Sequence, residues 1–548
     1  MKKTLIIASV ALVALVSTFA VRNDFGLNRN IEIMVNIMRE ISENYVDQVD
    51  PDLLLEYAAE GISRRLDPYT EYLPEEEMTS FEVLTTGKYG GIGSLIRKDG
   101  DFVKIAQPYQ GTPADRAGLI IGDKIVEIDG QSVEGFTTEQ VSALLKGTPG
   151  SDVKLVVRRL LSGEDQEVTI RRERISIPGV PYYGFVGDKA DSIGYIQHSD
   201  FTAGVAADMH AAIVVLKELG AKALVLDYRN NGGGVLQEAV DILSLFVPRG
   251  TEVVTLKGRR DSVVYATSKH PLDLEIPLVV LINENSASAA EIVAGSLQDL
   301  DRAVLVGAKS FGKGLVQAPR PVGYNSYVKM TTSKYYIPSG RCIQELDYSD
   351  HSSAGKAVKV ADSLRQKFYT KGGREVYDGG GINPDKKVEP SYISTFAATL
   401  YTLGHIDTFC DDYFRRNHQN KIDIETFSIT DTDYQEFKEF ISTKEVKYQS
   451  ATRGVLKALK EAAQSDLYSE VSQQIEELEA GLKDDTAANV EHYRDDITRS
   501  INSNIILRYA YQAGVIQNSL TDDPELQSAL EILSNSEEYS AILSALTF

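Results

Sequence analysis

Residues 278–300 read LVVLINENSASAAEIVAGSLQDL. Leu278–Ile282 form a short uninterrupted apolar run, which is typical of a buried strand. A polar turn with Ser286 and Ser288 follows, and the stretch Ala289–Leu300 then has helical character. Strands and helices alternate in this way from 190 to 390, which predicts an α/β layer. The two hydroxyls stand where unpaired N–H groups of a helix N-terminus can stabilise a developing negative charge.

Ser288 also has a purely structural explanation. Ser288-Ala289-Ala290-Glu291 matches a capping box, in which the serine and the glutamate each satisfy a backbone N–H of the first helical turn. This segment alone therefore leaves two interpretations open, a helix cap and a nucleophile.

A second segment, Val306–Gln317, contains Lys313 between two glycines, so that its loop can approach another backbone closely. A lysine can act as the base for a serine if burial lowers the pKa of its amine; an ordinary exposed loop lysine is the alternative. Gln317 falls on the same side as Lys313 in either a strand or a helix. Their Cα atoms would be roughly 13 Å apart along a strand and roughly 6 Å apart on a helix. A direct hydrogen bond between them therefore requires a bend near Gly314. The segment matches neither GxGxxG nor GxxxxGK[ST], the phosphate-binding patterns.

A third segment, Leu226–Gly234, reads LDYRNNGGG and resembles a strand that runs into a glycine turn. Three glycines can bring backbone N–H groups close to a ligand atom, as an oxyanion hole requires. A tight turn that serves geometry alone fits these residues equally well.

Together, Asp227–Gly234, Asn283–Glu291 and Val306–Gln317 resemble the three signature segments of the carboxy-terminal processing (tail-specific) peptidases, in the order of that family. The resemblance covers about residues 40–390, and Leu66–Glu77 is similar to a segment that precedes the PDZ domain of the family. It implies a crotonase/Clp-protease-like α/β core with an inserted or preceding PDZ domain, an N-terminal helical segment and a C-terminal helical accessory domain.

The resemblance also implies roles for individual residues. It makes Ser288 the nucleophile, Lys313 the general base and Gln317 the residue that orients the lysine. The implied oxyanion hole uses the N–H groups of Ala289 and of Gly233, with Gly234 as an alternative to the latter. The sequence departs from the family at Gly232, where many members have proline, and at Ala290, often serine. Neither change removes a reacting group.

Residues 87–173 read as short alternating strands with glycine turns and resemble a PDZ domain. Gly91-Ile92-Gly93 matches the loop whose amides bind the terminal carboxylate of a peptide, although a structural glycine turn is the alternative. Strand addition combined with carboxylate capture would confer a preference for free C-termini. For the apolar pocket of this groove we predict Ile92 and Leu144.

Composition excludes several classes of protein. The 548 residues carry 57 basic and 79 acidic side chains, a net charge of −22, whereas a nucleic-acid binder needs a basic surface. Cys342 and Cys410 are too few for a disulfide framework, and the seven histidines show no metal-ligand spacing. We therefore expect no nucleic-acid partner, no metal and no cofactor. His198 and His210, the histidines considered for a Ser/His/Asp triad, are predicted to be solvated or on a helix surface.

The N-terminus predicts export. Lys2 and Lys3 precede an uncharged apolar run of 18 residues, Thr4–Val21, which fits a signal peptide and is also long enough for an uncleaved membrane anchor. Residues 1–21 are assigned to this segment. The predicted location is the periplasm, with the protein either free or tethered to the inner membrane.

The remaining predicted divisions are residues 25–85 (N-terminal helical segment), 87–173 (PDZ domain), 174–390 (peptidase core) and 391–548 (acidic helical domain). The last region holds 27 acidic and 13 basic residues and one proline. Apolar residues at spacings of three and four predict one amphipathic helix in it: Leu456, Leu459, Ala463, Leu467, Val471, Ile475 and Leu478. Docking of an adaptor, homo-oligomerisation and substrate control all stay open for this region.

The function that follows is that of an exported serine endopeptidase with a Ser-Lys(-Gln) mechanism. It would bind protein or peptide substrates by their free C-termini and cleave near the tail. The alternative from another class is a catalytically silent PDZ adaptor on a peptidase scaffold. The presence of Ser288, Lys313 and Gln317 argues against that alternative.

Overall fold

The computed structural model describes residues 26–348, 357–448, 450–465, 471–482 and 486–544. The chain divides into two compact units. Unit 1 comprises the residues up to Thr79 with residues 315–333 and 346–359, and unit 2 comprises the rest. The predicted export segment, residues 1–21, lies outside the described residues. Across the described ranges, no helix has the length and apolar character needed to cross a membrane.

Unit 1 contains a helix over residues 26–44, helix α2 (Pro51–Ser63) and a β-hairpin. The hairpin joins β17 (Leu315–Gly323) to β18 (Ser326–Tyr336) through Tyr324 and Asn325, both with positive φ as a tight hairpin turn requires. The short strand β1 (Glu71–Leu73) pairs antiparallel with β18. Residues 25–85 were predicted to be helical, and β1 corrects this prediction. Its partner Lys329 is 258 residues away from Glu71, so local sequence does not reveal the pairing.

The central sheet of unit 2 has six strands, in which β10 is antiparallel to its neighbour and the others are parallel. In spatial order they are β10 (Tyr182–Val186), β11 (Ile193–Gln197), β12 (Ala223–Asp227), β15 (Leu278–Ile282), β16 (Val304–Gly307) and β23 (Lys386–Lys387). Every residue of β12 and β15 is buried. Parallel strands covered on both faces account for these continuous apolar runs.

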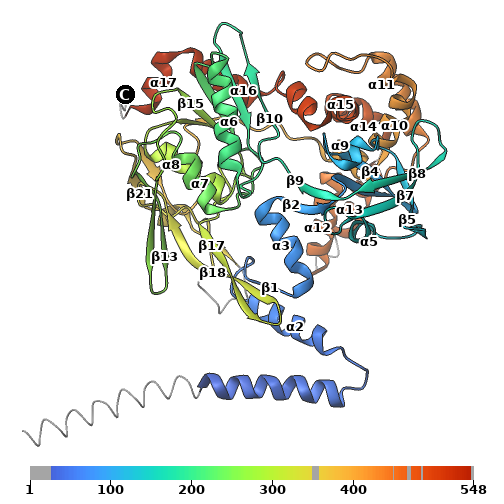
Figure 1. Ribbon diagram of the computed structural model, residues 1–548, viewed down its shortest axis with the longest axis horizontal. Coiled ribbons are helices and arrows are strands. Elements are labelled where there is room, and N and C mark those ends of the chain that lie inside the picture. Colours follow the sequence, from blue (N-terminus) through green and yellow to red (C-terminus); the bar gives the residue numbers. More distant parts are fainter. Residues whose placement is uncertain (1–25, 349–356, 449, 466–470, 483–485, 545–548) are drawn as a thin grey trace, which may run out of the picture. The chain divides into compact units, whose positions relative to one another are not determined.

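Helices cover this sheet. Those that follow its strands are α6 (Val205–Glu218), α7 (Leu236–Leu243) and α8 (Ala289–Asp299). Near the C-terminus, α16 (Pro524–Ser534) packs on β15 and β16, and α17 (Ser536–Leu543) packs on β16 (Figure 1). Leu526 and Leu530 share one buried cluster with Val279 of the sheet. The last helices of the region predicted as an accessory domain are therefore part of the core around the sheet.

The region predicted as a PDZ domain also lies in unit 2. Its sheet contains β3 (Ser94–Asp99), β4 (Phe102–Pro108), β5 (Lys124–Ile128), β7 (Asp152–Arg158) and β8 (Asp165–Arg171), with β6 (Gln131–Ser132) beside β5. Strands β2 (Lys88–Gly91) and β9 (Glu173–Ser176) form a separate pair, and the helices are α4 (Pro113–Arg116) and α5 (Thr138–Leu145). Burial alternates along β7, as expected for a sheet with one face on a core. Strand β3 is at the edge of its sheet.

The C-terminal region is helical: α9 (Thr395–Thr402), α10 (His405–Asn417), α11 (Asp431–Ser442), α12 (Ala451–Ser465), α13 (Ser472–Gly481), α14 (Thr486–His492) and α15 (Arg494–Ser519). Two helices, α12 and α13, stand where one amphipathic helix was predicted, and Leu467 lies outside the described residues. Ala463 and Ile475 are buried, whereas Leu459 and Leu478 are exposed. The periodicity therefore identified helical sequence on both sides of residues 466–470.

Candidate active site

Ser288 lies between strand β15 and helix α8, as the N-cap of the helix. Its backbone has φ 56° and ψ −115°, a region that non-glycine residues rarely adopt and that costs of order 1–3 kcal/mol. An N-cap residue is ordinarily extended. The Ser288 N–H donates to Glu291 Oε2 at 2.9 Å, and the Tyr335 hydroxyl donates to the Ser288 carbonyl at 3.2 Å. The bond of the predicted capping box between the Ser288 N–H and Glu291 is present. A helix cap does not require the strained backbone of Ser288, so capping alone does not explain this conformation.

Ser286, the other serine of the turn, is fully buried. Its hydroxyl donates to the Tyr228 carbonyl at 2.8 Å and accepts from the Asn283 N–H at 2.9 Å. The bond to Tyr228 joins the turn to the glycine-rich segment after β12, and the bond from Asn283 closes the turn itself. The Ser286 hydroxyl therefore has a structural role.

The glycine-rich segment Asp227–Gly234, which we call the oxyanion loop, lies directly against the Ser288 turn. A Cβ atom added to Gly233 would be 2.7 Å from Ser288 Cβ and 2.8 Å from the Ala289 nitrogen. Gly233 also has φ 92°, so both space and conformation require glycine. Gly232 faces open space, which is consistent with a minor effect of its departure from the proline of the family.

The N–H group of Gly233 is engaged in this structure. It donates to Asn231 Oδ1 at 2.8 Å, and the buried Asn231 side chain is itself anchored by a 2.8 Å bond to the His198 carbonyl. An oxyanion would compete with Asn231 for this N–H. Within the described ranges, no acceptor is hydrogen-bonded to the N–H of Ala289 or Gly234. The assignment of the Ala289 N–H and the Gly233 or Gly234 N–H to the oxyanion hole stays a prediction.

A buried carboxyl connects the serine to the lysine loop. Glu291, with no exposed surface, accepts four hydrogen bonds. The donors are the Ser288 N–H (2.9 Å), the Lys313 N–H (2.9 Å), the Gly312 N–H (2.7 Å) and the Ser310 hydroxyl (2.5 Å). Burial raises the Glu291 pKa to about 7, although these hydrogen bonds lower it. The sequence identified Glu291 as a capping residue and missed its bonds to the lysine loop, because Ser310 is 19 residues away.

Lys313 is partly buried, in a loop that two glycines allow to pack tightly. A Cβ atom on Gly312 would be 2.7 Å from Glu345 Cβ, and one on Gly314 would be 2.8 Å from the Gln344 nitrogen. Gln317 belongs to unit 1, in β17, where its Nε2 donates to Thr331 Oγ1 at 3.2 Å. The roles of Lys313 as a base and of Gln317 as its orienting partner stay predictions.

The two histidines have different environments. His198 is fully buried, its Nε2 lies 3.0 Å from the Asp200 carbonyl oxygen, and burial lowers its pKa to about 4. The prediction of a solvated or surface position is therefore wrong for His198, which is a neutral core residue. His210 is exposed on α6, as predicted.

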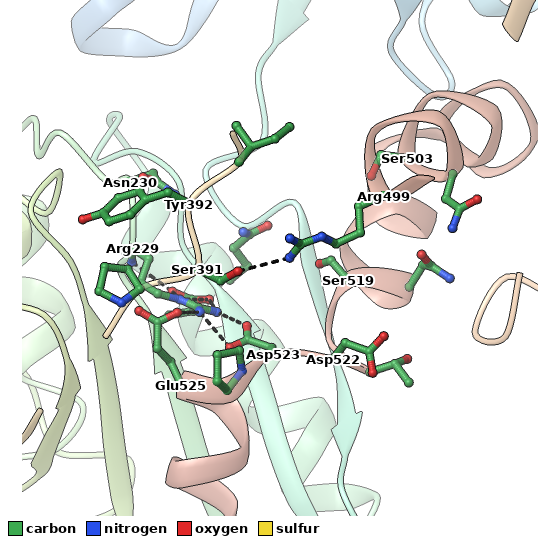
Figure 2. A pocket seen from close by; sticks show the side chains of 18 of the residues that line it. Arg229, Asn230, Ser391, Tyr392, Arg499, Ser503, Ser519, Asp522, Asp523 and Glu525 are labelled. Atoms are coloured by element: carbon green, nitrogen blue, oxygen red, sulfur yellow. Dashed lines mark hydrogen bonds and ion pairs between the residues drawn. The ribbon is translucent and has the colours of Figure 1, made fainter. Parts of the chain in front are cut away.

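Arg229, which the sequence analysis did not single out, lies in the oxyanion loop at the wall of a cavity of about 710 Å³ (Figure 2). Its guanidinium contacts Asp227 of the same loop and also Asp523 and Glu525 of the C-terminal region. Arg229 is part of the LDYRNNGGG segment, but two of its carboxylate partners lie almost 300 residues later in the sequence, where no local pattern connects them to it.

A second cavity, of about 310 Å³, lies between β3 and α5 and is lined by Gly91, Ile92 and Leu145 among others. Gly93 has φ 78°, and its carbonyl accepts bonds from the Tyr109 N–H and the Thr112 hydroxyl. Leu144 packs against the core beneath instead, so the prediction for that residue is wrong by one position. Val83 and Ile177, which flank the predicted PDZ domain, also line this groove.

Three family models match the chain: Peptidase family S41 over residues 192–351, a PDZ domain over 104–159, and the C-terminal helical domain of a probable PDZ-protease over 396–533. The carboxy-terminal-processing protease of Bartonella bacilliformis is 34% identical over 342 residues, which is 61% of this chain and 77% of that protein. The chain belongs to the carboxy-terminal processing peptidases. A probable CtpA-like serine protease of Staphylococcus aureus (strain N315) is 33% identical over 347 residues, 62% of this chain and 68% of that one.

As a member of this family the protein is a serine-type peptidase with a PDZ domain, and the family, fold class and enzyme class predicted from sequence are confirmed. Among solved structures, the photosystem II D1 C-terminal processing protease is 26% identical and is matched with a TM-score of 0.36. That match covers 65% of this chain and 87% of the other.

Proposed function

We propose that this carboxy-terminal processing peptidase is an exported endopeptidase that uses a Ser-Lys mechanism. Its PDZ domain binds the free C-terminus of a protein substrate, and the core cleaves peptide bonds near that tail. The observation that carries the proposal is the Glu291 carboxyl, which bonds both the Ser288 N–H and the Lys313 N–H at 2.9 Å. One buried group thus fixes the backbones of the nucleophile and the base against each other.

In the proposed reaction, neutral Lys313 takes the proton from Ser288 Oγ as this oxygen attacks the peptide carbonyl. The Ala289 N–H and a glycine N–H of the oxyanion loop stabilise the oxyanion. As the C–N bond breaks, the protonated Lys313 returns its proton to the leaving amine, and the C-terminal peptide departs. Water, deprotonated by the neutral lysine, then attacks the acyl-enzyme ester, and Ser288 Oγ recovers a proton as the acid product leaves. Gln317 orients the lysine. Because a protonated amine cannot act as a base, activity falls as the pH is lowered.

Tail recognition is supported by the groove between β3 and α5. As an edge strand, β3 can accept an added peptide strand, and the groove beside it is lined largely by apolar and aromatic side chains. The Gly91-Ile92-Gly93 loop is at one end of β3, and its amides would bind the terminal carboxylate. The substrate class is therefore protein tails with an apolar terminal residue.

The proposed location is the periplasm, free or tethered once to the inner membrane by residues 1–21, in agreement with the lysines and apolar run at the N-terminus. Self-association or adaptor docking through the C-terminal helices is a further part of the proposal. Fractionation of cells, with a carbonate wash, separates the free form from the tethered form.

The test is cleavage of an unfolded protein with an apolar C-terminus by residues 22–548. Ser288→Ala and Lys313→Ala should abolish turnover, and amidation of the substrate C-terminus should slow it. Lys309→Ala is the matched control, because this lysine is in the same loop but makes a partly exposed ion pair with Glu345. Its turnover should match that of the unmodified enzyme.

Circular dichroism and binding of the tail peptide show whether each variant is folded. Binding of the tail without any cleavage by the unmodified enzyme would favour the adaptor alternative. Cleavage that persists in Lys313→Ala would exclude the proposed base.

A further inference from the structure

We propose that the C-terminal helical domain supplies two positioning residues, Asp523 and Glu525, which hold the oxyanion loop through Arg229. This inference deepens the proposed function and rests on it. In this proposal the two carboxylates act through Arg229 and not on the reacting atoms. They fix the guanidinium of a residue whose main chain leads, four residues later, to Gly233.

The guanidinium of Arg229 is fully coordinated by carboxylates. Its Nε lies 3.0 and 3.1 Å from the two oxygens of Asp227, and its Nη2 lies 2.6 Å from Asp227 Oδ2. Asp523 receives bonds from Nη1 at 3.0 Å and from Nη2 at 2.6 Å, and Glu525 Oε2 receives one from Nη1 at 2.5 Å (Figure 2). The five N–H donors of an arginine match these acceptors, so the planar group has one orientation.

Two of the three carboxylates come from the start of α16. Asp523 is the N-cap of this helix and accepts the Leu526 N–H at 2.9 Å. Glu525 is in the first turn and is 6% exposed. The Arg229 side chain is 13% exposed. The contact is therefore a largely buried bridge between the oxyanion loop and the C-terminal domain.

From Arg229 the constraint passes along a short main chain that is held by several hydrogen bonds. The Arg229 N–H donates to Asp227 Oδ1 at 2.9 Å, and the Asn230 N–H donates to Asn283 Oδ1 at 2.9 Å. The Asn231 carbonyl then accepts the Ala287 N–H at 2.9 Å, directly before Ser288. The loop is thus held at Arg229 on one side and at the nucleophile turn on the other. Loosening the Arg229 end moves the glycine amides, and small displacements of such donors reduce catalysis strongly.

A role in stability alone does not explain the cluster. Helix α16 is already anchored on the sheet by Leu526, Ala529 and Leu530. Buried ion pairs add little net stability compared with apolar residues of the same size, but they fix geometry. Placing three carboxylates around one guanidinium fits a requirement for orientation better than one for stability.

The experiment uses the full chain with Asp523→Asn and Glu525→Gln combined. Asparagine is also a good N-cap, and glutamine keeps the shape of glutamate, so the fold and its melting temperature should change little. The control is Asp522→Asn, the same kind of carboxylate-to-amide change at an adjacent residue that lines the same cavity. We measure kcat and KM on a tail peptide, binding of that peptide to the PDZ domain, and hydrogen exchange of residues 228–235.

The double variant should lose kcat by about 100-fold with KM and tail binding within about twofold, as expected when oxyanion stabilisation is impaired. Exchange across residues 228–235 should accelerate in the double variant and stay unchanged in Asp522→Asn. An unchanged kcat in a folded double variant would overturn the inference, as would a loss that follows tail binding or the unfolded fraction.

Failure of the proposed function gives a different pattern, because the unmodified enzyme would then not cleave at all. Hydrogen exchange does not depend on cleavage and still reports whether Asp523 and Glu525 hold the loop. Unchanged exchange in the double variant would overturn the inference even in that case.

Discussion

Glu291, beside the candidate nucleophile, and Asp407, between the PDZ domain and the C-terminal helices, are both buried carboxyl groups. Each accepts several polar contacts, yet their pKa values are shifted in opposite directions. Burial raises the Glu291 pKa to about 7, and the four neutral donors around it, three backbone N–H groups and a hydroxyl, lower the pKa too little to offset the burial. Burial also acts on Asp407, but Arg508 and Lys104 outweigh it and lower the pKa of that carboxyl.

The Asp407 cluster joins two domains. Lys104, on strand β4 of the PDZ domain, contacts Asp407 and lies 2.9 Å from Asp411, both on α10. Arg508 of α15 approaches the same two carboxylates at 2.8 and 2.5 Å. The Lys104 and Arg508 side chains are 3% and 1% exposed. The PDZ domain is thus attached to the C-terminal helices by buried ion pairs between side chains.

The comparison shows that the charge of the partner, rather than the number of hydrogen bonds, decides how a buried carboxyl responds to pH. Glu291 loses stabilisation as the pH rises, and Asp407 loses it as the pH falls. The active site and the PDZ attachment are therefore expected to weaken at opposite ends of the pH range.

The largest effect is expected from Lys104→Met, which leaves the Asp407 cluster short of one cation. Removing one partner of a buried ion pair typically costs about 3 kcal/mol or more. Lys124→Met is the control: its lysine lies 3.0 Å from Asp99, but the side chain is 38% exposed, so we expect a change below about 0.5 kcal/mol. Urea unfolding measures both. Equal effects of the two variants would show that burial of the cluster does not matter.

The second prediction concerns pH. The Glu291 pKa is raised from 4.5 to about 7, so below pH 4.5 the folded and unfolded states are both protonated and its contribution is complete. As the pH rises through 7, the unfolding free energy of the enzyme relative to Glu291→Gln should fall by about 3 kcal/mol. Unfolding of both proteins at pH 4.5, 6 and 8 measures this difference. A difference that is constant with pH would mean that folding leaves the Glu291 pKa unchanged.

Acid should lower the stability of the Asp407 cluster. Because its pKa is lowered, Asp407 contributes stability above its ordinary pKa near 3.8, and this is lost as the pH falls through the lower folded value. Asp407→Asn should remove that acid sensitivity while it leaves the change near pH 7 in place.

Glu291→Gln should also reduce turnover. In one orientation the new NH₂ group would face the N–H groups of Ser288 and Lys313, and in the other it would face that of Gly312. Because two donors repel each other, the Ser288 turn and the lysine loop would move apart. A small misplacement of the reacting groups can cost about 100-fold in kcat. The control is Glu238→Gln, because Glu238 also accepts two backbone N–H groups, at Gly204 and Ala206, outside the candidate site. A similar loss in both variants would mean that general destabilisation, not alignment of the site, lowers activity.

The sequence predicted what depends on local pattern. The apolar run Leu278–Ile282 became β15 with the same bounds, and α8 begins at the predicted Ala289. Apolar continuity and capping residues act over a few positions, so they can be identified without a structure. The family resemblance rests on three such local segments.

What the sequence did not reveal depends on distant partners. Arg229 and Glu525 are 296 residues apart, and no periodicity connects them. The pairing of β1 with β18 is equally remote, and a strand of three residues has no pattern of its own. Leu145 lines the groove in place of the predicted Leu144, and helical spacing alone does not distinguish these two neighbouring positions of α5.

The smallest effect is expected from Lys309→Ala. Lys309 is in the same loop as Lys313, and its Nζ lies 3.3 Å from Glu345 Oε1, but its side chain is 33% exposed. Water screens such a pair, so its loss should cost less than about 0.5 kcal/mol and should not alter the pH dependence of turnover. Urea unfolding and a pH–rate profile measure both. If Lys309→Ala lowered the free energy of unfolding or the turnover as much as Glu291→Gln does, proximity to the loop rather than burial would determine what a charged group contributes there.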